Sequence, residues 1–244
     1  MNLKLTLAAL FFSFWIYSQS YEVTYSMLQK DNGHNITTNI KCYLNGNKNY
    51  SVYEEDFELK GNKNTQNNEN LEGNEIISFN TNPVFFKDLS NNVIYYSDHV
   101  RFNFFNIVDR FEKIEWTIEN ETKFILNYDC QKATCKFRGR NFVVYFSKEL
   151  PFNDGPWKLS GLPGLILEVS SIDKIATFEI KAEKIEIAQE VKMIDNMYKS
   201  LEKITFEEYC IIYKKKYEES LYKIIDSNGE TRPMKKGFKE YYIE

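Results

Sequence analysis

The chain has 244 residues and a formal net charge of −4, and this mildly acidic balance, without a basic patch, disfavours nucleic-acid binding. Aromatic residues make up 16% of the chain, an enrichment typical of half-buried sheet surfaces. The length is sufficient for one domain with a sizeable core.

Residues 1–20, MNLKLTLAALFFSFWIYSQS, have the pattern of a secretory signal peptide. Lys4 supplies the positive charge, and Leu5 to Tyr17 form an apolar run of about 13 residues, shorter than the roughly 20 that a spanning helix needs. The alternative is an N-terminal membrane anchor. We predict cleavage near Tyr21, a single domain over residues 21–244, no transmembrane segment after cleavage, and export to the periplasm, the outer membrane or the medium.

Short strands with hairpin punctuation dominate the rest of the chain. Alternation over residues 21–28 predicts the first strand, and the pair Asn45-Gly46 predicts a tight hairpin turn. The polar stretch 55–75 is predicted to be a mobile surface loop, with a distorted edge strand as the alternative. Further strands are predicted at Val84–Lys87, Val93–Ser97, Lys113–Ile118 and Lys123–Tyr128 (a hairpin across Glu119-Asn120-Glu121), Thr134–Phe137 and Asn141–Phe146 (a hairpin across Arg138-Gly139-Arg140), Leu165–Val169 and Ala176–Ala188.

One amphipathic helix is predicted over residues 205–226. Thr205 and Glu208 form a capping box, Asn228-Gly229 supplies the stop, and an apolar stripe recurs at spacings of three and four. The predicted fold is α+β, mainly β: a curved antiparallel sheet or open half-barrel with this C-terminal helix packed against it. A β-sandwich is the alternative. The stripe comprises Phe206, Cys210, Tyr213, Tyr217, Leu221 and Ile224.

Catalytic motifs are absent from the sequence. His34 lies in a turn and His99 at a strand end, and no nucleophile, zinc or phosphate-loop signature surrounds them. We therefore predict no catalytic residue, no metal site and no cofactor, with a Cys–His nucleophile as the alternative. Export permits disulfides, but their pairing stays open. If Cys130 and Cys135 share one continuous strand, they cannot bridge each other. The four cysteines are Cys42, Cys130, Cys135 and Cys210.

Two carboxylates, Asp154 and Glu168, flank a turn rich in glycine and proline. A glycosidase-like acid pair is one hypothesis for them. The favoured interpretation is that Asp154 is an ordinary solvated turn residue and that Glu168 is one polar position in an apolar strand.

The turn itself, NDGPWKLSGLPGLILEVSS over residues 153–171, is unusual because apolar side chains frame it. Leu162 to Leu165 fit a type II turn, in which proline presets φ and Gly164 supplies a positive φ. Gly161 is predicted to allow close approach of another chain segment. We expect Leu165 to enter the core and Leu162 to line a groove. The candidate binding or structural motif is Trp157, Gly161, Leu162, Pro163, Gly164, Leu165 and Ile166.

The hexapeptide at Gly161–Ile166 resembles the name-giving motif of the GLPGLI family of exported Gram-negative envelope proteins. The likeness extends over a central block and to the strand NKNYSVYEE, while Tyr145-Phe146 replaces the more common Trp-Tyr. The resemblance implies an envelope location and no established reaction. Matching positions in the block are Trp116, Lys123, Cys130, Ala133, Gly139, Arg140, Pro151, Gly155 and Pro156.

These observations favour a non-enzymatic periplasmic or envelope protein that binds an apolar ligand, or a segment of an outer-membrane protein, near the apolar turn. An exported hydrolase that uses carboxylates or a cysteine is the alternative. A purely structural envelope protein is the third hypothesis, and it predicts no concave pocket.

Overall fold

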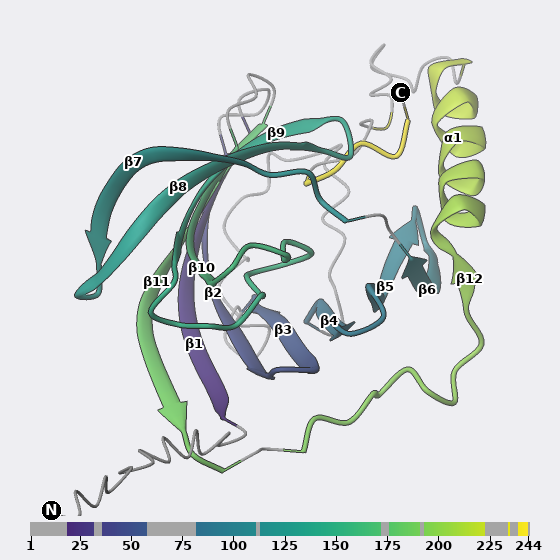
Figure 1. Cartoon of the computed structure of the whole chain (residues 1–244). Helices are drawn as coiled ribbons and strands as arrows, with labels where there is room; N and C mark the ends of the chain where they lie inside the picture. Colours follow the sequence, from purple (N-terminus) through teal and green to yellow (C-terminus); the bar gives the residue numbers. More distant parts are fainter. Residues whose placement is uncertain are drawn as a thin grey trace, which may run out of the picture.

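A computed structural model describes most of the chain (Figure 1). The predicted signal sequence up to residue 18 and the predicted loop from residue 58 onward lie outside the described residues. The loop was predicted to start at residue 55, which is wrong, because residues 55 and 56 belong to strand β3. The described residues are 19–31, 36–57, 82–110, 113–171, 176–190, 193–222, 234 and 239–243.

The described strands form one twelve-stranded sheet in the order β12-β6-β5-β4-β3-β2-β1-β11-β10-β9-β8-β7. The end strands β12 and β7 do not pair with each other, so the curved sheet in Figure 1 is open. This confirms the mainly β prediction and excludes the β-sandwich. The strands are β1 Ser20–Asp31, β2 Ile36–Asn47, β3 Tyr50–Asp56, β4 Val84–Asp88, β5 Val93–Val100, β6 Asn103–Arg110, β7 Thr117–Ile125, β8 Tyr128–Phe137, β9 Arg140–Ser147, β10 Leu165–Ser171, β11 Ala176–Ala188 and β12 Ile204–Thr205.

The first hairpin turns later than predicted. Gly46 lies within β2, paired with Ser51 of β3, and the turn follows at residues 48–49, where the Asn47 side chain accepts hydrogen bonds from the next backbone amides. A Cβ at Gly46 would lie 2.3 Å from the ring of Tyr21. This glycine is therefore needed because an aromatic ring packs on the strand, and it does not form the turn.

The predicted hairpin across residues 119–121 is also wrong. These residues continue strand β7 through a register irregularity between Ile118 and Thr122. The chain reverses at Leu126 and Asn127, which both have positive φ, as a tight primed turn requires. The next hairpin, between β8 and β9, is confirmed, with Arg138 and Gly139 at positive φ.

Helix α1, Phe206–Tyr222, packs against β5, β6 and β12 at one end of the sheet (Figure 1). The capping box is confirmed: the Thr205 amide donates to the Glu208 carboxylate and the Glu208 amide donates to the Thr205 hydroxyl. Tyr209 is fully buried, and its hydroxyl donates to the His99 carbonyl. Leu221, placed on the buried stripe by the sequence, is 50% exposed. Ile224 and the predicted stop lie outside the described residues.

Candidate functional site

The loop between β9 and β10 carries the candidate motif and lies inside the curve of the sheet (Figure 1). Trp157, on this loop, is 2% exposed. Its ring centroid lies 6.1 Å from that of Phe137, 6.0 Å from that of Phe142 and 6.5 Å from that of Phe178. The apolar loop therefore fills the concave face where the sequence had suggested a ligand.

Two glycines of the loop have the reverse of their predicted roles. Gly161 has φ +92° and, with a Cβ added, would meet no described atom nearer than 3.9 Å. Gly164 has no positive φ; a Cβ there would lie 2.1 Å from the carbonyl oxygen of Ser147. Gly161 is thus required by its backbone conformation and Gly164 by the close approach of β9.

The predicted type II turn is also replaced. The Gly164 amide donates to the Leu162 carbonyl at 2.8 Å, which closes a three-residue turn around Pro163, and the fixed φ of proline suits an inverse γ-turn. Leu162 is 1% exposed, and Leu165 and Ile166 are fully buried. The groove expected at Leu162 is absent, because all three side chains enter the core.

Asp154 anchors the start of the loop, and its predicted solvation is wrong. Its carboxylate is fully buried, accepts a hydrogen bond from the Tyr21 hydroxyl at 2.5 Å and forms an ion pair with Lys87 at 2.5 Å. Lys87 also donates to the Gly155 carbonyl. Burial lowers the pKa of Lys87, against the opposing effect of Asp154. The cluster joins β1 and β4 to the loop.

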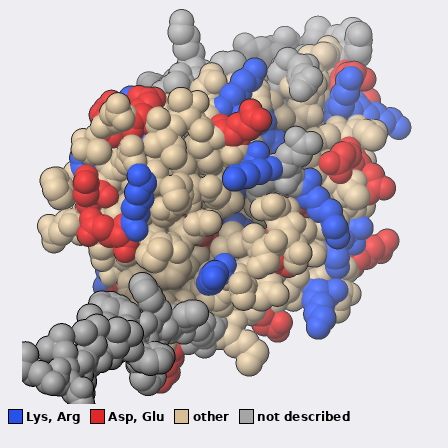
Figure 2. Space-filling model, in the orientation of Figure 1, with Lys and Arg blue, Asp and Glu red and all other residues tan. Residues whose placement is uncertain are grey.

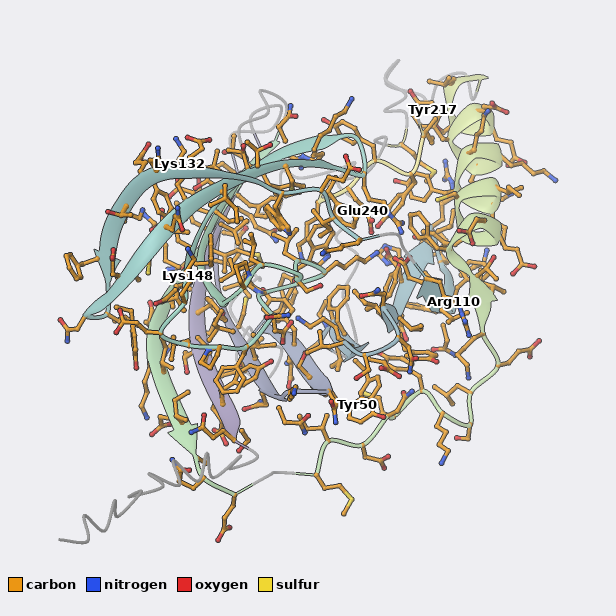
Figure 3. All side chains as sticks on the ribbon, viewed as in Figure 1. Tyr50, Arg110, Lys132, Lys148, Tyr217 and Glu240 are labelled. Carbon is orange, nitrogen blue, oxygen red and sulfur yellow. The ribbon has the colours of Figure 1, made fainter. Side chains whose placement is uncertain are left out.

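A second buried ion cluster holds the middle of the loop. The Lys158 Nζ donates to Tyr96 Oη at 2.9 Å, to Asp109 Oδ2 at 3.0 Å and to Glu240 Oε1 at 2.5 Å. Arg138 pairs with Asp109 at 2.7 Å. Figure 3 shows Glu240 between α1 and the β8–β9 hairpin. Two cations thus face two carboxylates, and the cluster is balanced in charge.

Sequence reasoning missed this second cluster, although one signal was present. Lys158 is an isolated charge between Trp157 and Leu159, and a lysine flanked by core residues must find buried partners. Its partners, from β5, β6 and the C-terminal segment, are distant in sequence and became visible only in the fold.

Glu168 belongs to a different site. Its carboxylate pairs with Lys123 at 2.7 Å, and the Lys123 Nζ lies 3.7 Å from the centroid of the Tyr145 ring. None of the described partners of Glu168 is a partner of Asp154. The fold therefore gives no support to the glycosidase-like pair.

The cysteines are unsuited to nucleophilic chemistry in this structure. All four are free thiols, and Cys130 and Cys135 lie on one strand, β8, which is the arrangement in which they cannot bridge each other. Burial raises the pKa of Cys42 and Cys135 to about 12 and that of Cys130 and Cys210 to about 11. With these raised pKa values the four thiols are protonated at neutral pH. Because the thiolate is the reactive form, they are poor nucleophiles. His99 lies in β5 beside Asp98, at 3.5 Å, and His34 lies outside the described residues.

A groove of about 700 Å³ opens between α1, the end of β8 and the segment before β7. Its apolar lining includes Ile114, Phe137 and Phe206, all buried, and Ile211 of α1, which is 69% exposed. The groove thus combines apolar side chains with an equal number of charged ones, and concave sites that join apolar and polar groups can bind ligands. The charged residues of the lining are Lys113, Glu115, Lys136, Arg138 and Glu207.

Basic and acidic side chains are interspersed on the face shown in Figure 2. Within the described ranges, no group of three or more His, Cys, Asp or Glu is placed to hold a metal ion. No helix among these residues is long and apolar enough to cross a membrane.

These features define a β-rich protein with an open sheet, a loop held by buried ion clusters and an apolar groove beside its helix. The chain belongs to the family described as "N-glycanase peptide, N-terminal domain", whose model matches residues 69–208. No curated protein matches the chain significantly.

Solved structures share this fold. Structures of PNGF-II in the C2 and P21 space groups have TM-scores of 0.51 and 0.52, with 19% sequence identity to this chain. Both matches cover 81% of this chain, but only 32% and 34% of the PNGF-II chains. The chain thus spans about a third of the length of these solved relatives.

Proposed function

We propose that the protein is a non-enzymatic binding or accessory module of the cell envelope, and that its binding surface is the groove beside α1. The groove carries the proposal, because it combines a buried apolar lining with an accessible side. The ligand is an apolar molecule or a segment of an envelope partner. Export and membership of the GLPGLI-type envelope proteins are part of the same proposal and rest on the N-terminal pattern and on the Gly161–Ile166 motif.

The buried charges of the loop have structural roles. Lys87 is satisfied by Asp154 and Gly155, while Lys158 is satisfied by Asp109 and Glu240. Charges that neutralise one another inside a packed loop are structural, since a general acid or base must reach a substrate proton. The family match, confined to an N-terminal domain, is consistent with an accessory role.

An exported hydrolase remains the second candidate because the matching family is named after an N-glycanase. On this hypothesis the chain would release glycans from an N-glycosylated peptide. Cleavage would need an acid or base that reaches a cleft. Glu115 and Glu207 are the carboxylates that line the groove, and substitution of either would then abolish release.

A fluorescent apolar dye, 1-anilinonaphthalene-8-sulfonate, tests the binding proposal. We expect saturable binding of one dye per protein, and we expect Ile211→Glu to weaken it by about tenfold or more, because the new negative charge enters the apolar lining and repels the sulfonate of the dye. Leu221→Glu is the matched control: Leu221 is also exposed on α1 but does not line the groove. Equal binding by both variants and the parent protein would refute the groove as the site.

A further inference from the structure

Residues 239–243, called here the 239–243 segment, lie between the tip of the β8–β9 hairpin and α1 (Figure 1). They belong to no strand or helix. The Tyr241 amide donates a hydrogen bond to the Arg138 carbonyl at 3.0 Å, and side chains make the contacts that follow. The segment is therefore held in the fold much as a bound peptide is held on a receptor.

The acidic residue of the segment completes a buried ion cluster. Glu240 is 2% exposed, accepts a hydrogen bond from Lys158 Nζ at 2.5 Å and lies 3.6 Å from a guanidinium nitrogen of Arg138. Asp109 contacts both cations as well. Without Glu240, two cations inside the fold would share one carboxylate. Because a buried charge needs a partner, this position requires a second acidic side chain.

The tyrosine two residues later occupies an aromatic recess. Its ring centroid lies 4.6 Å from that of Tyr213 and 5.3 Å from that of Tyr209, both on α1. The Tyr242 hydroxyl donates a hydrogen bond to Asp98 Oδ2, on β5, at 2.8 Å. The recess therefore provides an acceptor for a hydroxyl group as well as faces for a ring.

Two further contacts fit the remaining residues. Lys239 forms an ion pair with Glu55 of β3, whose side chain is 1% exposed. At the hairpin, a Cβ on Gly139 would lie 2.8 Å from the ring of Tyr241, so the missing side chain makes room for that ring. Separate elements of the fold thus provide partners, in order, for a lysine, an acidic residue, an aromatic residue and a tyrosine.

We propose that these elements form a peptide-binding site and that the 239–243 segment is its internal occupant. The ligand is a segment of another protein with the same order of side chains: lysine, acidic residue, aromatic residue, tyrosine. Residues 241–243 are only half-buried, so the site is open to solvent on one side. The inference goes beyond the proposed function, because this site is distinct from the groove, although Arg138 and Phe206 border both.

A blocked peptide with the sequence of the segment, acetyl-Lys-Glu-Tyr-Tyr-Ile-amide, tests the inference on the full chain. The internal occupant competes with this probe, so the apparent affinity falls with the fraction of protein whose site is empty. Glu240→Ala and Tyr242→Phe weaken the occupant and leave its partners unchanged. In isothermal titration calorimetry we expect the probe to bind these variants about tenfold and about threefold more tightly than the parent protein. Tyr50→Phe, which alters no contact of the segment, should match the parent (Figure 3).

Two control peptides and a further variant test the two main contacts. In the Glu240→Ala protein, replacing Glu by Ala in the probe should weaken binding about tenfold, and replacing its second Tyr by Phe about fivefold. Adding Asp98→Ala should remove the preference for Tyr over Phe, because the acceptor is lost. Adding Asp129→Ala, at an exposed position on β8, should keep it. Tyr242→Phe serves for the same comparisons if Glu240→Ala does not fold.

NMR locates the bound peptide. Saturation with the probe should shift the amide resonances of residues 239–243, because the probe displaces them. Binding that leaves these resonances unchanged would place the peptide elsewhere and overturn the inference. Equal affinity for the parent protein and both variants would overturn it too. If neither variant binds the probe at about 1 mM, the 239–243 segment is a permanent part of the fold and the inference is wrong.

Discussion

Lys158 and Asp109 form an ion pair in which both side chains are fully buried, with 3.0 Å between Nζ and Oδ2. Asp109 lies on β6 and Lys158 on the loop between β9 and β10. The pair therefore ties the loop inside the curved sheet to a strand near the opposite edge. Together with the Lys87–Asp154 pair, it holds the loop at two points, and the loop fills the concave face.

Removing one partner of this pair should be costly. Lys158→Met leaves Asp109 and Glu240 buried with less compensating charge, and we expect a loss of about 3–5 kcal/mol in the free energy of unfolding. Urea denaturation measures it. Lys148→Met, at an exposed position, should change stability by less than about 0.5 kcal/mol. Similar effects in the two variants would show that the cluster does not hold the loop.

The second prediction concerns the way in which Glu240 makes the free energy of unfolding depend on pH. Burial raises the pKa of Glu240 above its usual 4.5, although Lys158 and Arg138 act to lower it and Asp109 adds to the rise. Between 4.5 and the raised value, the folded protein binds more protons than the unfolded chain, so this carboxyl contributes less stability as the pH rises. The stability that this carboxyl contributes is greatest below pH 4.5, and it is lost as the pH rises through the pKa of Glu240 in the folded protein.

Comparison with Glu240→Gln, which does not titrate, isolates this contribution. The difference in unfolding free energy, parent minus variant, should fall as the pH rises above 4.5 and then level off. Urea denaturation at several pH values from about 4 to about 8 measures it. A difference that grows with pH would mean that Lys158 and Arg138 lower the pKa of Glu240 more than burial raises it.

The third prediction compares two glycines. Gly164→Ala places a methyl group 2.1 Å from the Ser147 carbonyl oxygen, so the backbone of β9 or of the loop must move, and we expect a loss of about 3 kcal/mol. Gly161→Ala makes only an ordinary contact, 3.9 Å from the Trp116 indole nitrogen, but keeps φ +92°, and should cost about 1–2 kcal/mol. Thermal denaturation of the two variants shows which substitution costs more stability. The reverse order would contradict the close approach at Gly164.

The fourth prediction concerns the leucines of the loop. Leu162 and Leu165 are both buried, so truncation of either to alanine should cost about 2–5 kcal/mol. Chemical denaturation measures the loss, and dye binding in the groove should be retained in both variants. An unchanged midpoint for Leu162→Ala would restore the earlier expectation that this side chain lines a binding surface.

The fifth prediction concerns export. N-terminal sequencing of the protein recovered from the envelope or medium should begin within a residue or two of Tyr21, at the start of β1. Recovery of an intact Met1 would contradict the signal-peptide interpretation.

Local patterns predicted most of the strands, the capping box and the mainly β fold. Two of the failures have a common physical cause, which is long-range packing. Gly46 looks like a turn residue but is needed because Tyr21 packs on it, and Gly164 looks like a positive-φ residue but is needed because Ser147 approaches it. Neither neighbour is visible in the local sequence.

The candidate site was harder to predict for the same reason. The apolar character of the loop was evident, and so was its glycine requirement. Its burial depends on Lys158 meeting Asp109 and Glu240, which are 49 and 82 residues away in the chain. The groove joins residues of β8, α1 and the segment before β7, and no sequence pattern links these three.

The central claim is our proposal that this chain binds an apolar ligand or an envelope partner and does not carry out the reaction for which its family is named. Mass spectrometry of an N-glycosylated peptide, incubated with an equimolar amount of the purified protein, tests this claim most directly. The account predicts that the glycopeptide keeps its full mass at the end of the incubation. Loss of the glycan mass, abolished by Glu115→Gln or Glu207→Gln, would contradict the account and establish the hydrolase.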